Sequence, residues 1–284
     1  MARLDFKCRW SPTLGRLEST HELIWGTKAY NPETNKEDPC VFFGIYGLPD
    51  FYTLWRHKGK RYVLWAGTDI IHFENGYWLD EVGKIRIDNK ALAQWIDTNC
   101  ENWCENEVEQ ERLFKLGISC RVCPSFLGDV NNFPITYQYN RRPKVYSSVS
   151  GDNFEMYGWP TIERIAGKCE VDFYLYGNTK KWKTKHKNVK VIGRVPQEQF
   201  NEEIKEMQCG LRPLDFDGFS EVLGKAVLMG QYPISRIKYV HIDHYSTDES
   251  LISFLNKLVR RYRPNIKARN FYLKTFNQYP WNQK

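Results

Sequence analysis

The chain has 284 residues, of which 42% are hydrophobic, and its formal net charge is +7. This composition excludes an intrinsically disordered chain and supplies enough apolar material for one large domain or two of ordinary size. Because the sequence has no run of about 18 apolar residues and no secretory signal at its amino terminus, we expect a cytoplasmic protein without a transmembrane segment.

The amino-terminal half alternates between strand-like and helix-like patterns. Short apolar runs bounded by Gly or Pro predict strands at 39–47, 60–67 and 118–125. Helical spacing predicts helices at 48–59, 91–99 and 105–117. A strand, a helix and a second strand in succession are typical of a parallel sheet. The stretch 131–143 is rich in turn formers and indicates a linker.

The same alternation resumes after the linker. The predicted strands lie at 144–151, 171–178, 188–193 and 209–214, and the predicted helices at 157–167, 195–208 and 220–230. Two further helical patterns follow at 247–262 and 266–276. Two doubly wound α/β domains are the simplest interpretation.

Four of the eight cysteines have spacings that are reminiscent of a zinc site, Cys100-x3-Cys104 and Cys120-x2-Cys123. The first pair falls where a helical pattern begins. The second falls in a short predicted strand, which would point its two side chains to opposite faces. We therefore expect buried thiols without a metal.

Charge is distributed unevenly along the chain. Residues 251–284 carry eight Lys or Arg and no acid, whereas 97–111 carry six acids and no base. The run KKWKTKHKNVK at 180–190 holds six lysines around Trp182. These runs are either solvated faces or a surface for a polyanion, which would be a nucleic acid or an acidic membrane.

The order FYLYGN, NVKVIGRVPQEQF and MQCGLRPLDFDGFSEVLGKAVLMGQYPI within 144–235 resembles retaining GT-B glycosyltransferases of the glycogen-synthase-like group, in a short and divergent form. The resemblance implies two Rossmann-like doubly wound domains facing a cleft. The acceptor domain would span 1–135, the donor domain 136–262, and a basic helical tail at 263–284 would pack back toward the acceptor domain. No cofactor is implied beyond a nucleotide-sugar co-substrate, a UDP- or GDP-sugar, and no metal.

The resemblance also implies residues for the donor sugar. Asp217 matches the first acid of the family's Glu-x7-Glu pattern and would bind sugar hydroxyls. Gly218, Phe219 and Ser220 would present backbone amides beside it. The second acid of the pattern is replaced by Lys225, and a lysine cannot accept hydrogen bonds from ribose hydroxyls.

The same resemblance implies which residues supply cations for the diphosphate and which contact the nucleobase. Lys225 or Arg212 would replace the Arg and Lys that relatives place after the first strand of this domain. Arg194 and Val195, in the GRVP loop, would lie near the nucleobase, although a solvated loop arginine is an equal alternative for Arg194.

Three residues of the amino-terminal half are candidates for the acceptor side. Asp69 follows the strand at 60–67, where α/β sheets position ligands, and it has either a catalytic role there or caps the following segment. Thr13 and Gly15 lie in SPTLGR, a possible glycine loop after the first strand.

The sequence leaves three classes of function open. The first is a transferase with a trimmed acceptor domain, whose acceptor is DNA with a hydroxymethylated base, a polysaccharide or a lipid-linked molecule at an acidic membrane. The second is a catalytically degenerate GT-B-like binding protein for nucleic acid or an acidic surface. The third is an unrelated doubly wound protein.

Overall fold

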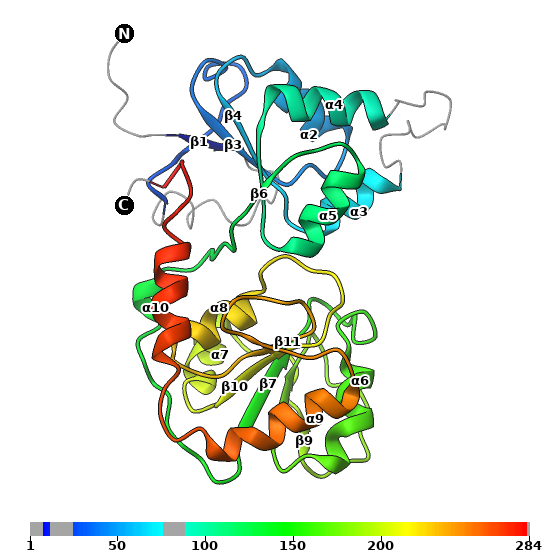
Figure 1. The fold of residues 1–284 in the computed structure, drawn as a ribbon, viewed down its shortest axis with the longest axis vertical. Helices are drawn as coiled ribbons and strands as arrows, with labels where there is room; N and C mark the ends of the chain where they lie inside the picture. The colour runs from blue at the N-terminus through cyan, green and yellow to red at the C-terminus, as the bar shows by residue number, and fades with distance from the viewer. Residues whose placement is uncertain (1–7, 12–24, 76–88, 283–284) are drawn as a thin grey trace. The chain divides into compact units, whose positions relative to one another are not determined.

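The computed structural model describes residues 8–11, 25–75 and 89–282 (Figure 1). The chain divides into two compact units. Unit 1 comprises Met1–Asp129, Phe216–Phe219 and Thr275–Lys284, and unit 2 comprises Val130–Asp215 and Ser220–Lys274. The expected tail at 263–284 is therefore divided between the units, and the four-residue segment Phe216–Phe219 belongs to the first unit although unit 2 flanks it in sequence.

Unit 1 is built on a parallel six-stranded sheet with the strand order β2-β1-β3-β4-β5-β6. The strands are β1 Arg9–Ser11, β2 Lys28–Ala29, β3 Cys40–Phe43, β4 Arg61–Leu64, β5 Glu101–Cys104 and β6 Arg121–Val122. The helices are α2 Leu48–Arg56, α3 Thr68–Glu74, α4 Asn89–Asn99 and α5 Glu107–Lys115.

The sheet of unit 1 is apolar on both faces, as expected for parallel strands covered on both sides. Every residue of β3 is buried. One face packs against α2, α3 and α4 through Leu54, Ile70 and Ile96. The other face carries an aromatic cluster in which the end of the chain takes part, because Tyr279 and Trp281 stack with ring centroids 4.6 Å apart.

Strand β5 corrects the sequence analysis, which placed Cys100 and Cys104 at the start of a helical pattern. Cys104 instead closes β5, and its Sγ lies 3.3 Å from the Sγ of Cys120. Within the described part of the chain, no group of three or more His, Cys, Asp or Glu side chains is arranged to hold a metal ion.

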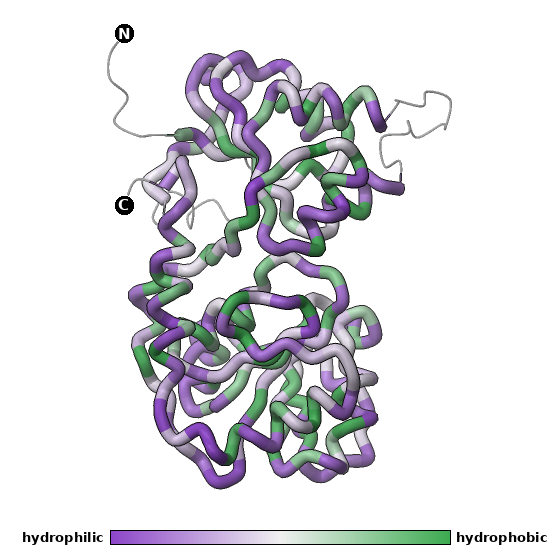
Figure 2. The backbone as a smooth tube through the Cα atoms, in the orientation of Figure 1, coloured by the Kyte–Doolittle hydropathy of each residue, from purple (hydrophilic) through white to green (hydrophobic). Residues whose placement is uncertain are grey.

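Unit 2 contains a second parallel six-stranded sheet, with the order β12-β11-β10-β7-β8-β9. The strands are β7 Lys144–Ser148, β8 Asp172–Tyr176, β9 Val189–Val191, β10 Cys209–Arg212, β11 Ile234–Ser235 and β12 Asp243–His244. The helices are α6 Trp159–Ile165, α7 Gln197–Ile204, α8 Glu221–Leu228, α9 Asp248–Lys257 and α10 Ile266–Thr275, with short 3-10 turns η1 Val130–Asn132, η2 Ala166–Lys168 and η3 Leu258–Arg260. Hydrophobic stretches lie at the centre of this unit (Figure 2).

The order of strands in unit 2 defines a switch point. Strands β7, β8 and β9 follow one another to one side, and the chain then returns to place β10 on the other side of β7. In doubly wound sheets, ligands bind outside the carboxyl ends of the strands that flank such a point. The carboxyl ends of β7 and β10 are therefore where a ligand is expected in unit 2.

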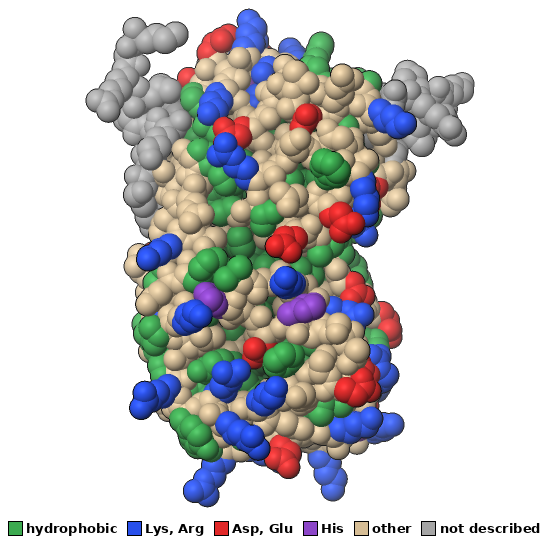
Figure 3. Space-filling model, viewed as in Figure 1, with side chains coloured by type: hydrophobic (Ala, Val, Ile, Leu, Met, Phe, Trp, Pro, Cys, Tyr) green, Lys and Arg blue, Asp and Glu red, His purple; other side chains and the backbone are tan. Residues whose placement is uncertain are grey.

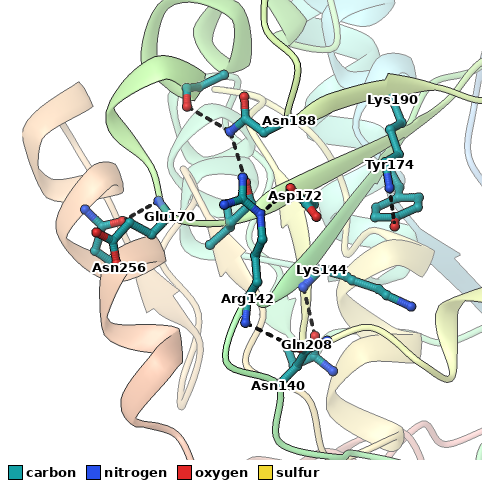
Figure 4. A network of polar contacts seen from close by, with 12 residues as sticks. Asn140, Arg142, Lys144, Glu170, Asp172, Tyr174, Asn188, Lys190, Gln208 and Asn256 are labelled. Atoms are coloured by element: carbon teal, nitrogen blue, oxygen red, sulfur yellow. Dashed lines mark hydrogen bonds and ion pairs between the residues drawn. The ribbon is translucent and has the colours of Figure 1, made fainter.

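At the amino ends of the strands of the same sheet, polar contacts join the strands to the loops before them (Figure 4). Arg142 Nε pairs with Asp172 Oδ1 at 2.7 Å. The backbone N–H of Lys144 donates to Gln208 Oε1 at 2.8 Å, which links the starts of β7 and β10. These contacts fasten the amino ends of the strands to the loops before them.

None of the helices among the described residues is long and apolar enough to span a membrane.

Candidate active site

A pocket opens at the carboxyl edge of the sheet in unit 2. It has a volume of about 210 Å³. The ends of β7 and β8, the loop from β9 to α7 and the first turn of α7 supply its lining. The lining residues are Ser148, Val149, Tyr176, Gly177, Gly193, Arg194, Val195, Gln197 and Phe200. Most ligand sites measure roughly 300–1,000 Å³. The pocket therefore suits one part of a nucleotide sugar rather than the whole molecule.

Two glycines line this pocket. Gly193 has φ +81°, a conformation that side chains other than glycine rarely adopt. A Cβ at Gly177 would lie 2.9 Å from the ring of Phe154 and 3.3 Å from that of Trp159. Gly193, in the GRVP loop, is thus required by its backbone conformation, and Gly177, at the end of the strand motif, by the rings packed against it.

Arg194 and Val195, which the sequence analysis placed near the nucleobase, both line the pocket. Arg194 is exposed, and its guanidinium lies 3.4 Å from the Oδ1 of Asn178. The loop therefore brings a cation and an apolar side chain to the same cavity.

Arg212 marks the switch point itself. It is the last residue of β10 and is buried, and its guanidinium donates to the carbonyl oxygen of Ser148 at 3.0 Å. It also lies over the ring of Tyr157, 4.4 Å from the centroid. Because Ser148 lines the pocket, this guanidinium holds a positive charge next to the pocket wall.

Lys225, the residue in place of the family's second acid, lies on α8 and is 6% exposed. Its Nζ lies 5.2 Å from the ring centroid of Phe200, another pocket residue, and 3.9 Å from Glu221. Burial lowers its pKa, and Glu221 opposes this shift. The lysine is therefore a desolvated cation next to an aromatic ring that lines the pocket.

A second cavity in unit 2, of about 500 Å³, is a weaker candidate. It lies at the amino ends of β7 and β10, beside Lys144 and Gln208. Its lysine is already paired with Glu206 at 3.0 Å. Since doubly wound sheets bind ligands at the carboxyl ends of their strands, we favour the smaller pocket despite its size.

The segment with Asp217 packs within unit 1. Asn106 Nδ2 donates to the carbonyl oxygen of Asp217 at 2.8 Å, and the amide of Phe219 donates to Glu105 Oε2 at 2.8 Å. The Asp217 side chain is half-buried. The predicted role of the Phe219 amide toward a donor sugar thus competes with a hydrogen bond already made.

Ser220 begins α8 as its N-cap. Its Oγ accepts from the amide of Val222 at 3.2 Å, which satisfies one of the unpaired amides of the first helical turn. The Ser220 hydroxyl is therefore engaged in helix capping, and the predicted role of the Ser220 backbone amide toward the donor stays a prediction.

Asp69 is fully buried in unit 1. Its carboxylate accepts from the amides of Ile45 at 3.2 Å and Ala66 at 3.0 Å, and thereby fastens the loops after β3 and β4 to each other. The N-cap of α3 is Gly67, without a side-chain cap. Asp69 therefore neither faces solvent nor caps the helix in the expected way, and burial raises its pKa to about 7.

Two further buried acids, Glu105 and Glu109, lie beyond the carboxyl end of β5. Glu109 Oε2 accepts from the amide of Glu105 at 2.7 Å, while Glu109 Oε1 has no hydrogen-bond partner among the described residues. Burial raises the pKa of Glu105 to about 8, and burial together with Glu105 and Asp69 raises that of Glu109. Sequence reasoning missed both, because they belong to an acidic run that is typical of a solvated face.

The remaining acceptor-side candidates, Thr13 and Gly15, lie outside the described residues.

No protein-family model and no curated protein sequence matches the chain. Among solved structures, it matches the apo form of the lipopolysaccharide outer core galactosyltransferase WaaB with a TM-score of 0.59 and 13% identity, covering 97% of each chain. It matches Anabaena HepE in complex with UDP and glucose with a TM-score of 0.55 and 11% identity, over 83% of this chain and 74% of HepE.

A third match is a variant of S. aureus TarM in complex with fondaparinux, α-GlcNAc-glycerol and UDP, with a TM-score of 0.54 and 12% identity. It covers 92% of this chain, and the chain spans 54% of the length of TarM. These neighbours are GT-B glycosyltransferases, and the two parallel sheets have the same architecture. The predicted GT-B fold, with two doubly wound α/β parts, is confirmed.

Proposed function

We propose that the protein is a retaining glycosyltransferase that uses a nucleotide sugar, a UDP- or GDP-sugar, as its donor. The observation that carries the proposal is the pocket at the switch point of unit 2, with Arg194 in its wall and Arg212 beside it. A nucleoside diphosphate needs a cavity for its base or ribose and cations for its phosphates. Two structural neighbours were solved with UDP, which agrees with this choice of ligand.

The proposed chemistry follows from charge. During transfer, positive charge develops on the sugar ring and negative charge on the leaving diphosphate. Arg212 and Lys225 are the cations assigned to the diphosphate, because fixed charges in a site of low dielectric lower the barrier more than mobile ones in water. Asp217 is assigned to the sugar hydroxyls, because a carboxylate accepts the hydrogen bonds that hydroxyl groups donate.

For the acceptor we propose a polyanion, with DNA that carries hydroxymethylated bases as the first choice. The support is the segment 181–188, in which the lysines at 181, 183, 185 and 187 are exposed and the residues between them are partly buried. The alternation of exposed and partly buried residues leaves these four ammonium groups in contact with solvent. Trp182 anchors the segment, since its ring lies 6.0 Å from that of Trp159.

The rest of the surface in view does not form one basic patch. On the face shown in Figure 3, Lys and Arg side chains are interspersed with Asp and Glu side chains. The proposal of a polyanionic acceptor therefore rests on the lysine row. An acidic polysaccharide or membrane surface is the competing acceptor, and sugar transfer to modified DNA, measured beside transfer to an acidic polysaccharide, separates the two.

A binding protein with a degenerate GT-B fold is the second candidate. The specific observation in its favour is the buried Lys225 at the position of the family's ribose-binding acid. Such a protein would bind DNA or an acidic surface without turning over any nucleotide sugar.

Isothermal titration calorimetry with UDP, GDP, ADP and TDP tests the donor site. We expect one nucleotide to bind the wild type, and Arg212→Ala to weaken that binding at least about tenfold, the loss of one charge-assisted hydrogen bond. Lys190→Ala, which removes an exposed lysine of β9 that contacts the Tyr174 hydroxyl and is not among the described residues that line the pocket, is the control and should leave the affinity unchanged. If no nucleotide binds at millimolar concentration, the transferase proposal is wrong.

A further inference from the structure

The four-residue segment Phe216–Phe219 is held in unit 1 by two side chains that follow β5. The amide of Phe219 donates to Glu105 Oε2 at 2.8 Å, and the carbonyl oxygen of Asp217 accepts from Asn106 Nδ2 at 2.8 Å. Both residues on either side of Gly218 are thus fastened through their backbone.

The fit around the segment is close. A Cβ on Gly218 would collide with Glu105 Oε2, and a Cβ on Gly67 would lie 3.1 Å from the amide nitrogen of Gly218. Gly67 also has φ +87°, which favours glycine at that position. The carboxylate of Glu105 and the backbone of the segment therefore touch without room for a side chain between them.

Glu105 is itself held in place. Its Oε1 accepts from the amide of Ser125 at 3.1 Å and from the hydroxyl of the same serine, and its own amide donates to Glu109 Oε2. Asn106 is the N-cap of α5, where its Oδ1 accepts from the amide of Glu109 at 3.0 Å. Each of the two side chains that hold the segment thus has a second anchor in unit 1.

We propose that Glu105 and Asn106 are positioning residues of the transferase. They fix the main chain of Asp217–Phe219 and so set the direction in which the Asp217 carboxylate meets the donor sugar, an inference that rests on the proposed function. The residues that hold the sugar-binding loop thus belong to unit 1, whereas the residues that line the nucleotide pocket belong to unit 2.

This division predicts a separable effect. A change at Asn106 should not alter the affinity for a free nucleoside diphosphate, because the described residues that line the pocket all belong to unit 2. It should lower kcat for sugar transfer or donor hydrolysis by about tenfold to a hundredfold, as expected for a misplacement of about 1 Å. Damage to the fold as a whole would lower both quantities together.

The test variant is Asn106→Ser. Serine remains a good N-cap for α5, but its hydroxyl is too short to reach the carbonyl oxygen of Asp217. The matched control is Asn102→Ser in β5, which loses a buried hydrogen bond to Trp65 and does not touch the segment. Hydrogen exchange of a peptide covering 214–222 is measured in both variants, together with nucleotide affinity and turnover.

Faster exchange of the 214–222 peptide, reduced turnover and unchanged nucleotide affinity in Asn106→Ser, with none of these effects in Asn102→Ser, would support the proposal. Unchanged exchange would overturn the claim that Asn106 holds the segment. Faster exchange with wild-type turnover would overturn its positioning role. If the wild type itself neither binds a nucleotide nor turns over a donor, the proposed function fails and the positioning role with it, while the exchange result still reports on the hydrogen bonds.

Discussion

The substitution Asp69→Asn tests the buried carboxyl groups of unit 1. Asp69 is fully buried, and burial raises its pKa from 3.8 to about 7. Between these two pH values the unfolded chain has lost the proton and the folded protein retains it. The free energy of unfolding therefore falls by about 1.4 kcal/mol for each pH unit in this window.

The sign follows from the direction of the shift. A carboxyl group with a raised pKa contributes its full stability below about pH 4, and this contribution disappears as the pH rises to about 7. Over the whole window from about pH 4 to about pH 7, the free energy of unfolding decreases by about 4 kcal/mol. Asparagine has no such proton. Its amide accepts from only one of Ile45 and Ala66, so the variant carries a constant penalty of about 1–2 kcal/mol.

Urea unfolding at several pH values measures the effect, with a brief exchange pulse at one fixed pH after each equilibration. The exchange of a peptide that contains β4 reports on unit 1 alone, which matters because a chain of two units need not unfold in one step. We expect the wild type to be more stable than the variant by about 1–2 kcal/mol at pH 4 and less stable than the variant by about 2–3 kcal/mol at pH 7.5. Parallel pH profiles would show that Asp69 is already ionised in the folded protein and would refute the reasoning.

Three further changes have expected outcomes. Gly218→Ala places a Cβ against the carboxylate of Glu105, so we expect a lower melting temperature and loss of transfer, and a wild-type melting curve would contradict this. Lys225→Met keeps the apolar stem and removes the charge, so calorimetry should show nucleotide binding about tenfold weaker, whereas unchanged binding would remove the lysine from the phosphate site. Trp281→Ala empties the centre of the aromatic cluster and should cost about 3–5 kcal/mol in the stability of unit 1 by urea unfolding, and a cost below about 1 kcal/mol would show that the chain end is not part of the core.

The alternation of strands and helices was predictable where the strands are apolar. Strands β8 and β10 come from the short runs DFYLY and CGLR, which Gly and Pro follow closely, and α7 begins directly after Pro196. Strand β5 was missed because two of the four residues in ENWC are polar. Pairing with its neighbours β4 and β6 stabilises it, and a single segment does not report that pairing.

The residues that line the pocket of unit 2 were easier to predict from the sequence than the contacts of the segment Phe216–Phe219. The family resemblance placed Arg194 and Val195 near the nucleobase, and both residues line the pocket at the carboxyl end of β9. The hydrogen bond between Asn106 and Asp217 joins residues 111 positions apart, and no periodicity in the sequence indicates it. Glu105 was likewise hidden, because burial of an acid depends on the partners that the fold brings to it.

Turnover of a nucleotide sugar tests the central claim most directly. The purified protein is incubated with UDP- and GDP-sugars, with and without DNA that contains hydroxymethylated bases, and the release of nucleoside diphosphate is measured for the wild type and for Asp217→Asn. The account predicts release from one donor by the wild type, and a rate about a hundredfold lower in Asp217→Asn with unchanged affinity for the free nucleotide. Binding of DNA without release from any donor would contradict the account and identify a binding protein.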